Sequence, residues 1–252
     1  MPIQYVRQLT GRVRTPDANR HLGFALAFVA GAINAGGFLA VAQYTSHMTG
    51  IVSAIADDLV LREYGLVLAG LGGLLSFLSG AACSAIMINY SRGRKLHGEY
   101  ALPLLLEAGL LLCFGLLGAR LSEIQGLFVP LTVMLLCFIM GLQNAIITKL
   151  SHGEVRTTHL TGVITDIGIE LGKLIYWNRG RAAGQQVSAD RDRLRVLLSL
   201  TACFFGGGVA GALGFKHVGY VSTLPLAALL VVLALIPALD DLRPLFRRAP
   251  RR

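Results

Sequence analysis

Six apolar stretches, each near the ~20 residues that span a hydrocarbon layer as a helix, dominate the 252-residue sequence. They cover approximately residues 22–42, 64–90, 101–119, 127–148, 194–215 and 221–239. These stretches are too long and too continuous to be the alternating strands of an outer-membrane barrel. The sequence therefore predicts an all-α polytopic membrane protein whose main partner is the lipid bilayer.

Composition supports this class and argues against nucleic-acid binding. The chain is 54% hydrophobic and 15% charged, with a formal net charge of +9, whereas soluble domains average ~25% charged residues. The basic residues gather in the tails 1–20 and 243–252 and in the segments 91–99 and 178–195. Such clusters orient membrane proteins, and no basic module interleaved with aromatic residues is present.

A motif that occurs twice divides the chain into two repeats. The first copy is Ser46-His47-Met48-Thr49-Gly50, closing at Asp58, and the second is Thr158-His159-Leu160-Thr161-Gly162, closing at Glu170. The His residues are 112 positions apart, and so are the closing carboxylates. We interpret this as an internal repeat, with repeat one at 22–119 and repeat two at 127–239 of a single membrane domain, 1–252.

The distribution of basic residues favours six spans over eight. If neither motif crosses, all four basic segments fall on one side, which the positive-inside rule makes cytoplasmic, with both termini there. Each repeat then holds three spans, so the two repeats have opposite orientations, as in many transporters. The predicted fold is six transmembrane helices in two inverted three-helix repeats, each with a short broken or re-entrant helical segment.

Each motif is predicted to dip into the membrane and return. Residues 50–61 as a helix would rise ~18 Å, too short for a crossing of ~30 Å. An extended dip over Tyr44–Met48 would lead to a helix whose N-terminus points toward the centre. The pairs Thr49-Gly50 and Thr161-Gly162 would lie at these tips, where Thr caps N–H groups and Gly allows close approach.

Two segments resemble the signature of the YoaK family, bacterial inner-membrane proteins grouped under a domain of unknown function. They are Phe28-Val29-Ala30-Gly31-Ala32-Ile33-Asn34-Ala35 and Ser46-His47-Met48-Thr49-Gly50. The resemblance extends over the six apolar stretches and implies a multi-pass protein of the bacterial inner (cytoplasmic) membrane, without an established activity. Members of that family often carry Asp where Asn34 stands, so a charge is absent here.

Eight polar or motif residues are candidates for contact with a small solute or ion. Histidine at membrane depth is often functional and titrates near neutrality. Alternatively, the two His residues hold the turns through backbone carbonyls, and the two Asn residues make interhelical hydrogen bonds. The candidates are Asn34, His47, Thr49, Gly50, Asn144, His159, Thr161 and Gly162.

Four carboxylates are candidates for proton coupling: Asp58, Glu107, Asp166 and Glu170. On one helix, His159, Asp166 and Glu170 would share a face within ~20°. Glu107 lies inside the third apolar stretch, where an ionisable group is a candidate proton site. Alternatively, Asp58 and Glu170 lie at helix ends in solvent, and Glu107 pairs with a neighbouring helix.

The function favoured by these patterns is that of a transporter or channel-like protein for a small solute or ion. The alternative is a non-transporting membrane partner or assembly protein whose motifs are structural. We expect no enzymatic activity, because no nucleophile or metal is evident, and no metal or other cofactor, because neither HExxH nor a Cys pair occurs. Glycine-rich patches in 64–90 and 194–215 predict close helix packing, within the chain or in a homodimer.

Overall fold

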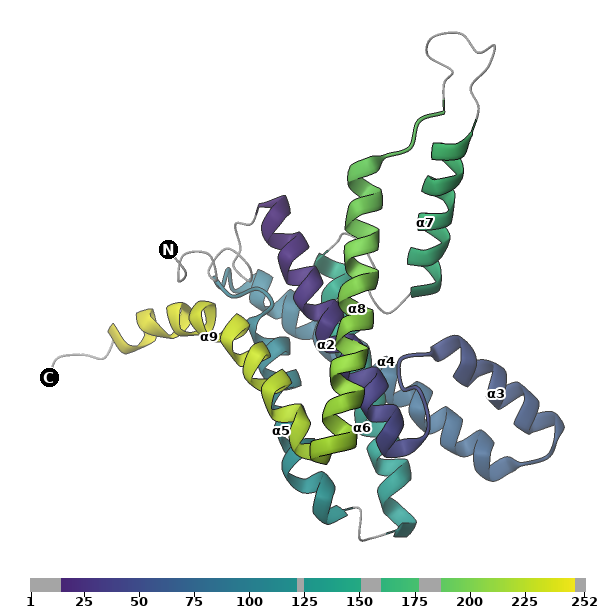
Figure 1. Ribbon diagram of the computed structural model, residues 1–252. Helices are drawn as coiled ribbons and strands as arrows, with labels where there is room; N and C mark the ends of the chain where they lie inside the picture. Colours follow the sequence, from purple (N-terminus) through teal and green to yellow (C-terminus); the bar gives the residue numbers. More distant parts are fainter. Residues whose placement is uncertain (1–14, 122–124, 151–159, 177–186, 248–252) are drawn as a thin grey trace, which may run out of the picture.

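The computed structural model describes residues 15–121, 125–150, 160–176 and 187–247, and these residues are almost entirely helical (Figure 1). The first repeat contains α2 (Pro16–Val41), α3 (Met48–Val60), α4 (Tyr64–Gly93) and α5 (Ala101–Leu121). The second repeat contains α6 (Gln125–Leu150), α7 (Leu160–Ile175), α8 (Arg191–Val218), the 3-10 turn η1 (Gly219–Ser222) and α9 (Thr223–Arg247). Each repeat thus follows the order long, short, long, long.

The lengths of the helices fall into two classes. The helices α2, α4, α5, α6, α8 and α9 have 21 to 30 residues, whereas α3 has 13 and α7 has 16. A helix of 21 residues rises ~32 Å, enough to cross a bilayer. The two short helices are the repeated motifs, so the prediction of a short helical segment in each repeat is confirmed.

Four described segments are long and apolar enough to span a membrane: Asp17–Val41, Tyr64–Gly93, Pro130–Leu150 and Arg191–Asp241. The last has 51 residues and contains α8, η1 and α9. It turns at Gly219, whose φ of +72° is in the region that favours glycine. The helix α5 supplies a shorter apolar stretch, Ala101–Leu116.

The first long helix of each repeat packs against the second long helix of the other. Helix α2 crosses α8, and α4 crosses α6. At the first crossing, Gly31 lies against Phe204 and Gly208, while Gly36 lies against Phe215. Residue numbers rise together along both helices, so α2 and α8 run in the same direction.

Glycine sets the distance between the crossing helices. A Cβ built on Gly207 would lie 2.7 Å from the carbonyl carbon of Phe28, and one on Gly31 would lie 2.8 Å from that of Phe204. The other crossing repeats the arrangement, with Gly80 against Phe138 and Gly141 against Phe77. These glycines therefore pack helices within the chain, as small residues do in membrane proteins.

Two further helix pairs, α2 with α6 and α5 with α9, run antiparallel. In the α2–α6 pair, Gln143 reaches the carbonyl of Leu26, while Gly37 lies against Leu136. In the α5–α9 pair, the Thr223 hydroxyl donates to the carbonyl of Leu111, and Gly98 lies against Pro237. In both pairs the residue numbers rise along one helix and fall along the other.

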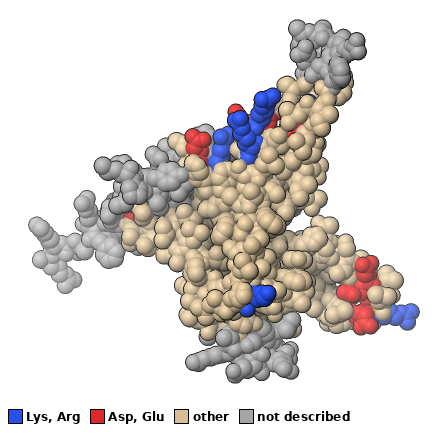
Figure 2. Space-filling view, viewed as in Figure 1, with Lys and Arg blue, Asp and Glu red and all other residues tan. Residues whose placement is uncertain are grey.

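The core lies between the six long helices, and apolar residues also cover much of the surface. Figure 2 shows charged side chains gathered at the extremities of the visible face, with a broad uncharged zone between them. Exposed apolar residues are frequent on α4 and α8, for example Leu68, Leu75 and Phe205. Exposure of this kind suits lipid contact rather than contact with water.

Candidate functional site

The segment between α2 and α3 folds back along α2. The Tyr44 ring stacks on Phe38 with centroids 4.5 Å apart, and the Ser46 hydroxyl donates to Asn34 Oδ1 at 2.7 Å. Since Val41 ends α2, a return to the level of Asn34 takes the chain ~10 Å inward. The segment before α3 therefore folds back along α2 and is held there by Asn34, whereas its entry into the membrane stays a prediction.

His47 occupies the N-cap position of α3 and makes no side-chain hydrogen bond to cap the helix. Its ring is exposed and lies over Gly50, where an added Cβ would be 2.9 Å from His47 Nδ1. The two motif residues are thus linked physically, because glycine leaves the space that the imidazole fills. The first-turn N–H groups of α3 lack a side-chain acceptor from the N-cap residue.

Helix α3 is attached to the rest of the protein along one narrow stripe. Ile51 is buried, and Ile55 packs on Gly70 of α4, where a Cβ would lie 2.6 Å from Ile55 Cγ1. Thr49 is exposed, so its hydroxyl is accessible at the start of the helix. Asp58 is half-buried near the turn into α4, where its carbonyl accepts from the N–H of Glu63 at 2.8 Å.

The second motif begins α7 in a corresponding way. Thr161 and Gly162 are exposed in its first turn, and the Thr165 hydroxyl donates to the carbonyl of Thr161 at 2.8 Å. His159 lies outside the described residues. In Figure 1, the N-terminal ends of α3 and α7 both lie toward the middle of the molecule, and their C-terminal ends point away from it.

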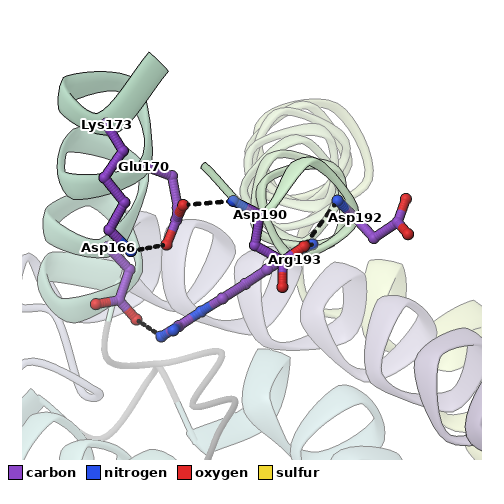
Figure 3. Close-up of polar contacts among 6 residues, drawn as sticks. All are labelled: Asp166, Glu170, Lys173, Asp190, Asp192 and Arg193. Atoms are coloured by element: carbon purple, nitrogen blue, oxygen red, sulfur yellow. Dashed lines mark hydrogen bonds and ion pairs between the residues drawn. The ribbon is translucent and has the colours of Figure 1, made fainter. Parts of the chain in front are cut away.

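Two carboxylates attach α7 to the start of α8 (Figure 3). Asp166 accepts from Arg193 at 3.0 Å. Glu170 is buried and accepts from Lys173 at 2.8 Å and from the N–H of Asp190 at 2.9 Å. Both are placed on the α8-facing side of α7, as their spacing predicted, and both already have basic partners.

The surroundings of Glu170 favour its ionised form. The hydrogen bond from Lys173 and that from the N–H of Asp190 hold the pKa of this carboxyl below its ordinary value, against the opposing effect of desolvation. Asp190 also caps α8, its carboxylate accepting from the N–H groups of Asp192 and Arg193. The network therefore holds α7 against α8 at the basic end of that helix.

Glu107 is in a different environment. It is fully buried in α5, and neither carboxylate oxygen has a hydrogen-bond partner among the described residues. Leu104 and Leu111, one turn away on the same face, and the adjacent Ala108 are also buried. The sequence alternative, in which Glu107 pairs with a neighbouring helix, has no support among these contacts.

The two Asn candidates lie at different heights in the helix pair α2–α6. Gln143, next to Asn144, is level with Leu26, and Asn34 follows Leu26 by eight residues, or ~12 Å along the helix. Asn34 holds the dip through Ser46, and Asn144 is buried. The Gln143 side chain donates an interhelical hydrogen bond to the carbonyl of Leu26.

Three polar residues with clear structural roles were not among the sequence candidates. Asp241, near the end of α9, accepts from the N–H groups of His97 and Gly98 at 2.6 and 2.8 Å. Ser46 anchors the dip, and Asp190 caps α8. Asp before a basic helical run is an N-cap signal and would have identified Asp190, whereas no local pattern indicates the long-range contact of Asp241.

A comparison with protein-family models gave one match, to the family described as "protein of unknown function (DUF1275)", over residues 22–236. Comparisons of the chain with curated proteins and with solved structures found no match. The family result agrees with a domain of unknown function, while the YoaK name stays a prediction. Because the match covers far more than half of the sequence, from α2 into α9, the chain belongs to the DUF1275 family.

Proposed function

We propose that the protein is a transporter or channel-like protein of the bacterial inner membrane that carries a small solute or ion. The solute site would lie where the N-terminal ends of α3 and α7 approach the middle of the molecule. The observation that supports this proposal is the pair of short helices, α3 with 13 residues and α7 with 16, each lying between long helices. Interrupted helices at repeat interfaces are where many transporters bind their cargo.

Helix directions support six crossings. Helices α2 and α8 run the same way, and α6 runs antiparallel to α2. Since α4 runs with α6, α2 and α4 have opposite directions, and the end of α2 lies on the side where α4 begins. The short helix between them, α3, then starts and finishes on one side, and the same reasoning applies to α7.

The antiparallel pairs support an inverted repeat. Equivalent helices, α2 with α6 and α5 with α9, pack in opposite directions, as a two-fold axis in the membrane plane requires. Repeat one would then send α3 into the membrane from one side, and repeat two would send α7 in from the other. The two motifs would approach the same region from opposite faces.

The basic residues support a cytoplasmic location for one end of the helix bundle. This is the end at which α2 and α8 begin and α4 and α6 finish. Contacts tie these ends together, since Lys149 donates to Asn89 at 3.1 Å and Asp241 binds the α4–α5 loop. Described basic residues at this end include Arg20, Arg92, Arg94, Lys95, Lys149, Arg191, Arg193 and Arg195. The opposite ends carry fewer, namely Arg62, Arg120 and Lys216. The positive-inside rule therefore favours a cytoplasmic location for both termini.

The chemistry at the motif favours a polar or anionic group. The N-terminus of a helix presents free N–H groups and a partial positive charge, and His47 leaves those of α3 without a side-chain cap. The Thr49 and Thr161 hydroxyls are exposed beside the two helix starts. Non-helical backbone such as residues 42–47 is tolerated at membrane depth where it is buried in protein or lines water.

The test is flux into proteoliposomes that contain the purified protein, measured with a panel of small inorganic anions, organic acids, cations and neutral solutes. We expect at least one solute to enter faster than into empty liposomes, and His47→Ala and Thr49→Ala to reduce that rate at least tenfold. His217→Ala is the matched control, because His217 is exposed at the end of α8 and belongs to neither motif. Equal flux in wild-type and His47→Ala protein would refute the site.

The second candidate is a membrane partner or assembly protein whose motifs are structural. The ion pairs of Asp166 and Glu170 favour it, because they show carboxylates of the second motif acting as structural contacts. On this hypothesis no solute would enter the liposomes, and His47→Ala would lower thermal stability rather than flux. Measuring both quantities on the same preparations distinguishes the two functions.

A further inference from the structure

The buried carboxyl of Glu107 has surroundings that an ionised group does not tolerate. The side chain is 0% exposed, and neither oxygen has a donor among the described residues. Its helix packs against α9, where Ala227, Leu230 and Ala234 are completely buried. An isolated carboxylate in such a place is strongly disfavoured, so the neutral acid is the form that this packing accommodates.

The second repeat acts as an internal control for the role of this residue. Leu102-Pro103-Leu104 at the start of α5 corresponds to Leu224-Pro225-Leu226 in α9, which aligns Glu107 with Leu229. Leu229 packs against the same hydrophobic core. Since leucine fulfils the packing role in one repeat, the architecture does not require a carboxyl group at this position.

The cytoplasmic end of the α5–α9 pair is closed above Glu107. The Asp241 carboxylate accepts hydrogen bonds from the backbone N–H groups of His97 and Gly98 and contacts the His97 ring at 3.0 Å. Gly98 is buried against Pro237. Glu107 follows Ala101, the first residue of α5, by six residues, which is ~9 Å along the helix. The contact between the loop of residues 94–100 and α9 therefore lies between Glu107 and this end of the helix pair.

We propose that Glu107 is the proton-binding site of this protein and that the contact between the 94–100 loop and Asp241 controls its access to the cytoplasm. The inference rests on the proposed transport function and names its coupling ion as the proton. With the loop closed, Glu107 holds a proton as the neutral acid. With the loop open, water reaches the carboxyl, the proton leaves to water, and the carboxylate is solvated until it is protonated again.

The charged groups of the neighbouring elements lie at the ends of the helices. On α4 and the following loop these are Arg92, Arg94, Lys95, His97 and Glu99, at the cytoplasmic end, where Glu99 already pairs with Arg92. On α9 they are Asp240 and Asp241 at the same end, and Tyr220 of η1 lies at the opposite end of α5, against Gly118. Helix α6 contributes Cys137 as a buried titratable side chain.

The first measurement is infrared spectroscopy of the full-length protein in lipid nanodiscs at neutral pH. The wild-type protein should show a carboxylic-acid C=O band that is missing in Glu107→Gln and in Glu107→Leu, which copies Leu229. Asp57→Asn is the matched control, since Asp57 is exposed on α3, and it should keep the band. A wild-type spectrum without a band that depends on Glu107 would overturn the proposal.

The second measurement is the rate at which this band shifts after transfer to D₂O. Asp241→Ala removes the acceptor that holds the loop, so exchange should become about tenfold faster or more, whereas Asp57→Asn should leave the rate unchanged. An exchange rate in Asp241→Ala equal to that of the wild type would refute the access route. Both measurements are independent of any transported solute.

The third measurement connects the site to transport. In proteoliposomes containing a pH-sensitive dye, solute entry should be accompanied by proton movement, and Glu107→Gln should abolish the proton movement. Proton-linked flux that persists in Glu107→Gln would overturn the coupling role. Absence of flux in the wild-type protein would instead refute the proposed transport function, and the infrared data would still decide whether Glu107 holds the proton.

Discussion

Replacement of Gly207 by Ala should separate the crossing of α2 and α8. The added Cβ would lie 2.7 Å from the carbonyl carbon of Phe28 and 2.9 Å from its Cα, whereas carbon atoms prefer ~3.5–4.0 Å. The Phe28 carbonyl oxygen also obstructs the added Cβ. All three atoms are backbone, so no side-chain rotation relieves the clash, and the helices must move apart by about 1 Å. Overpacking of this kind costs ~1–3 kcal/mol.

Gly206→Ala is the matched control for this prediction. Gly206 precedes Gly207 in α8, and a Cβ built there meets nothing within 4 Å. Alanine has the higher helix propensity by up to ~1 kcal/mol, so this variant should be neutral or slightly more stable. The two substitutions have the same chemistry, and the difference between them isolates the close approach.

The assay is thermal unfolding of the purified protein in detergent, followed by the loss of the monodisperse peak in size-exclusion chromatography. For a chain of this size, ~1–3 kcal/mol corresponds to a fall of roughly 3–10 °C. Gly31→Ala opens the same crossing, so the double variant Gly31→Ala/Gly207→Ala should lose less stability than the two single variants lose together. Gly141→Ala lies at the other crossing, so its loss of stability should add fully to that of Gly207→Ala. Equal melting temperatures for Gly206→Ala and Gly207→Ala would refute the packing argument.

Three further predictions concern the polar anchors. Asn34→Leu removes the acceptor of Ser46 and should destabilise the dip by about 1 kcal/mol, whereas Asn34→Asp keeps an acceptor; protease sensitivity of the segment before α3 distinguishes them. Asp190→Ala should cost ~0.5–2 kcal/mol through loss of the α8 cap, visible as faster hydrogen exchange in the first turn. Lys173 and the N–H of Asp190 lower the pKa of Glu170 in the folded protein. The Glu170 carboxylate therefore contributes its full stabilisation above the ordinary pKa of about 4.3, and this stabilisation is lost as the pH falls through the lowered pKa of the folded state. Protection of α7 from exchange should therefore drop below about pH 4 in the wild-type protein and show little of this acid dependence in Glu170→Gln.

The helical class and the short helices at the two motifs could be predicted directly from the sequence, because hydrophobic length and residue spacing are local properties. The ends of the helices were less accurate. The first helix was expected from residue 22, but it begins at Pro16, where the Thr15 hydroxyl caps the N–H of Ala18 at 3.2 Å. Thr-Pro before a helix is a start signal, but it lies outside the apolar run by which the helix was predicted.

The roles of the candidate residues depended on tertiary contacts that the sequence does not contain. The spacing of Asp166 and Glu170 correctly placed them on one face, but their basic partners come from α8 and from the next turn of α7. Asn34, a candidate for contact with a solute, accepts a hydrogen bond from Ser46. For Glu107, the lack of a partner depends on how α5, α6 and α9 pack, which sequence periodicity does not specify.

The most direct test of the account is the sidedness of four single-cysteine variants in a background without the native cysteines, labelled in intact cells with a reagent that does not cross the inner membrane. With two inverted repeats of three spans, Arg62→Cys and Lys216→Cys should react from outside the cell. In contrast, Arg94→Cys and Asp192→Cys should react only after the membrane is permeabilised. Labelling of Arg94→Cys and Asp192→Cys from opposite sides would contradict the inverted repeat and remove the basis of the transport proposal.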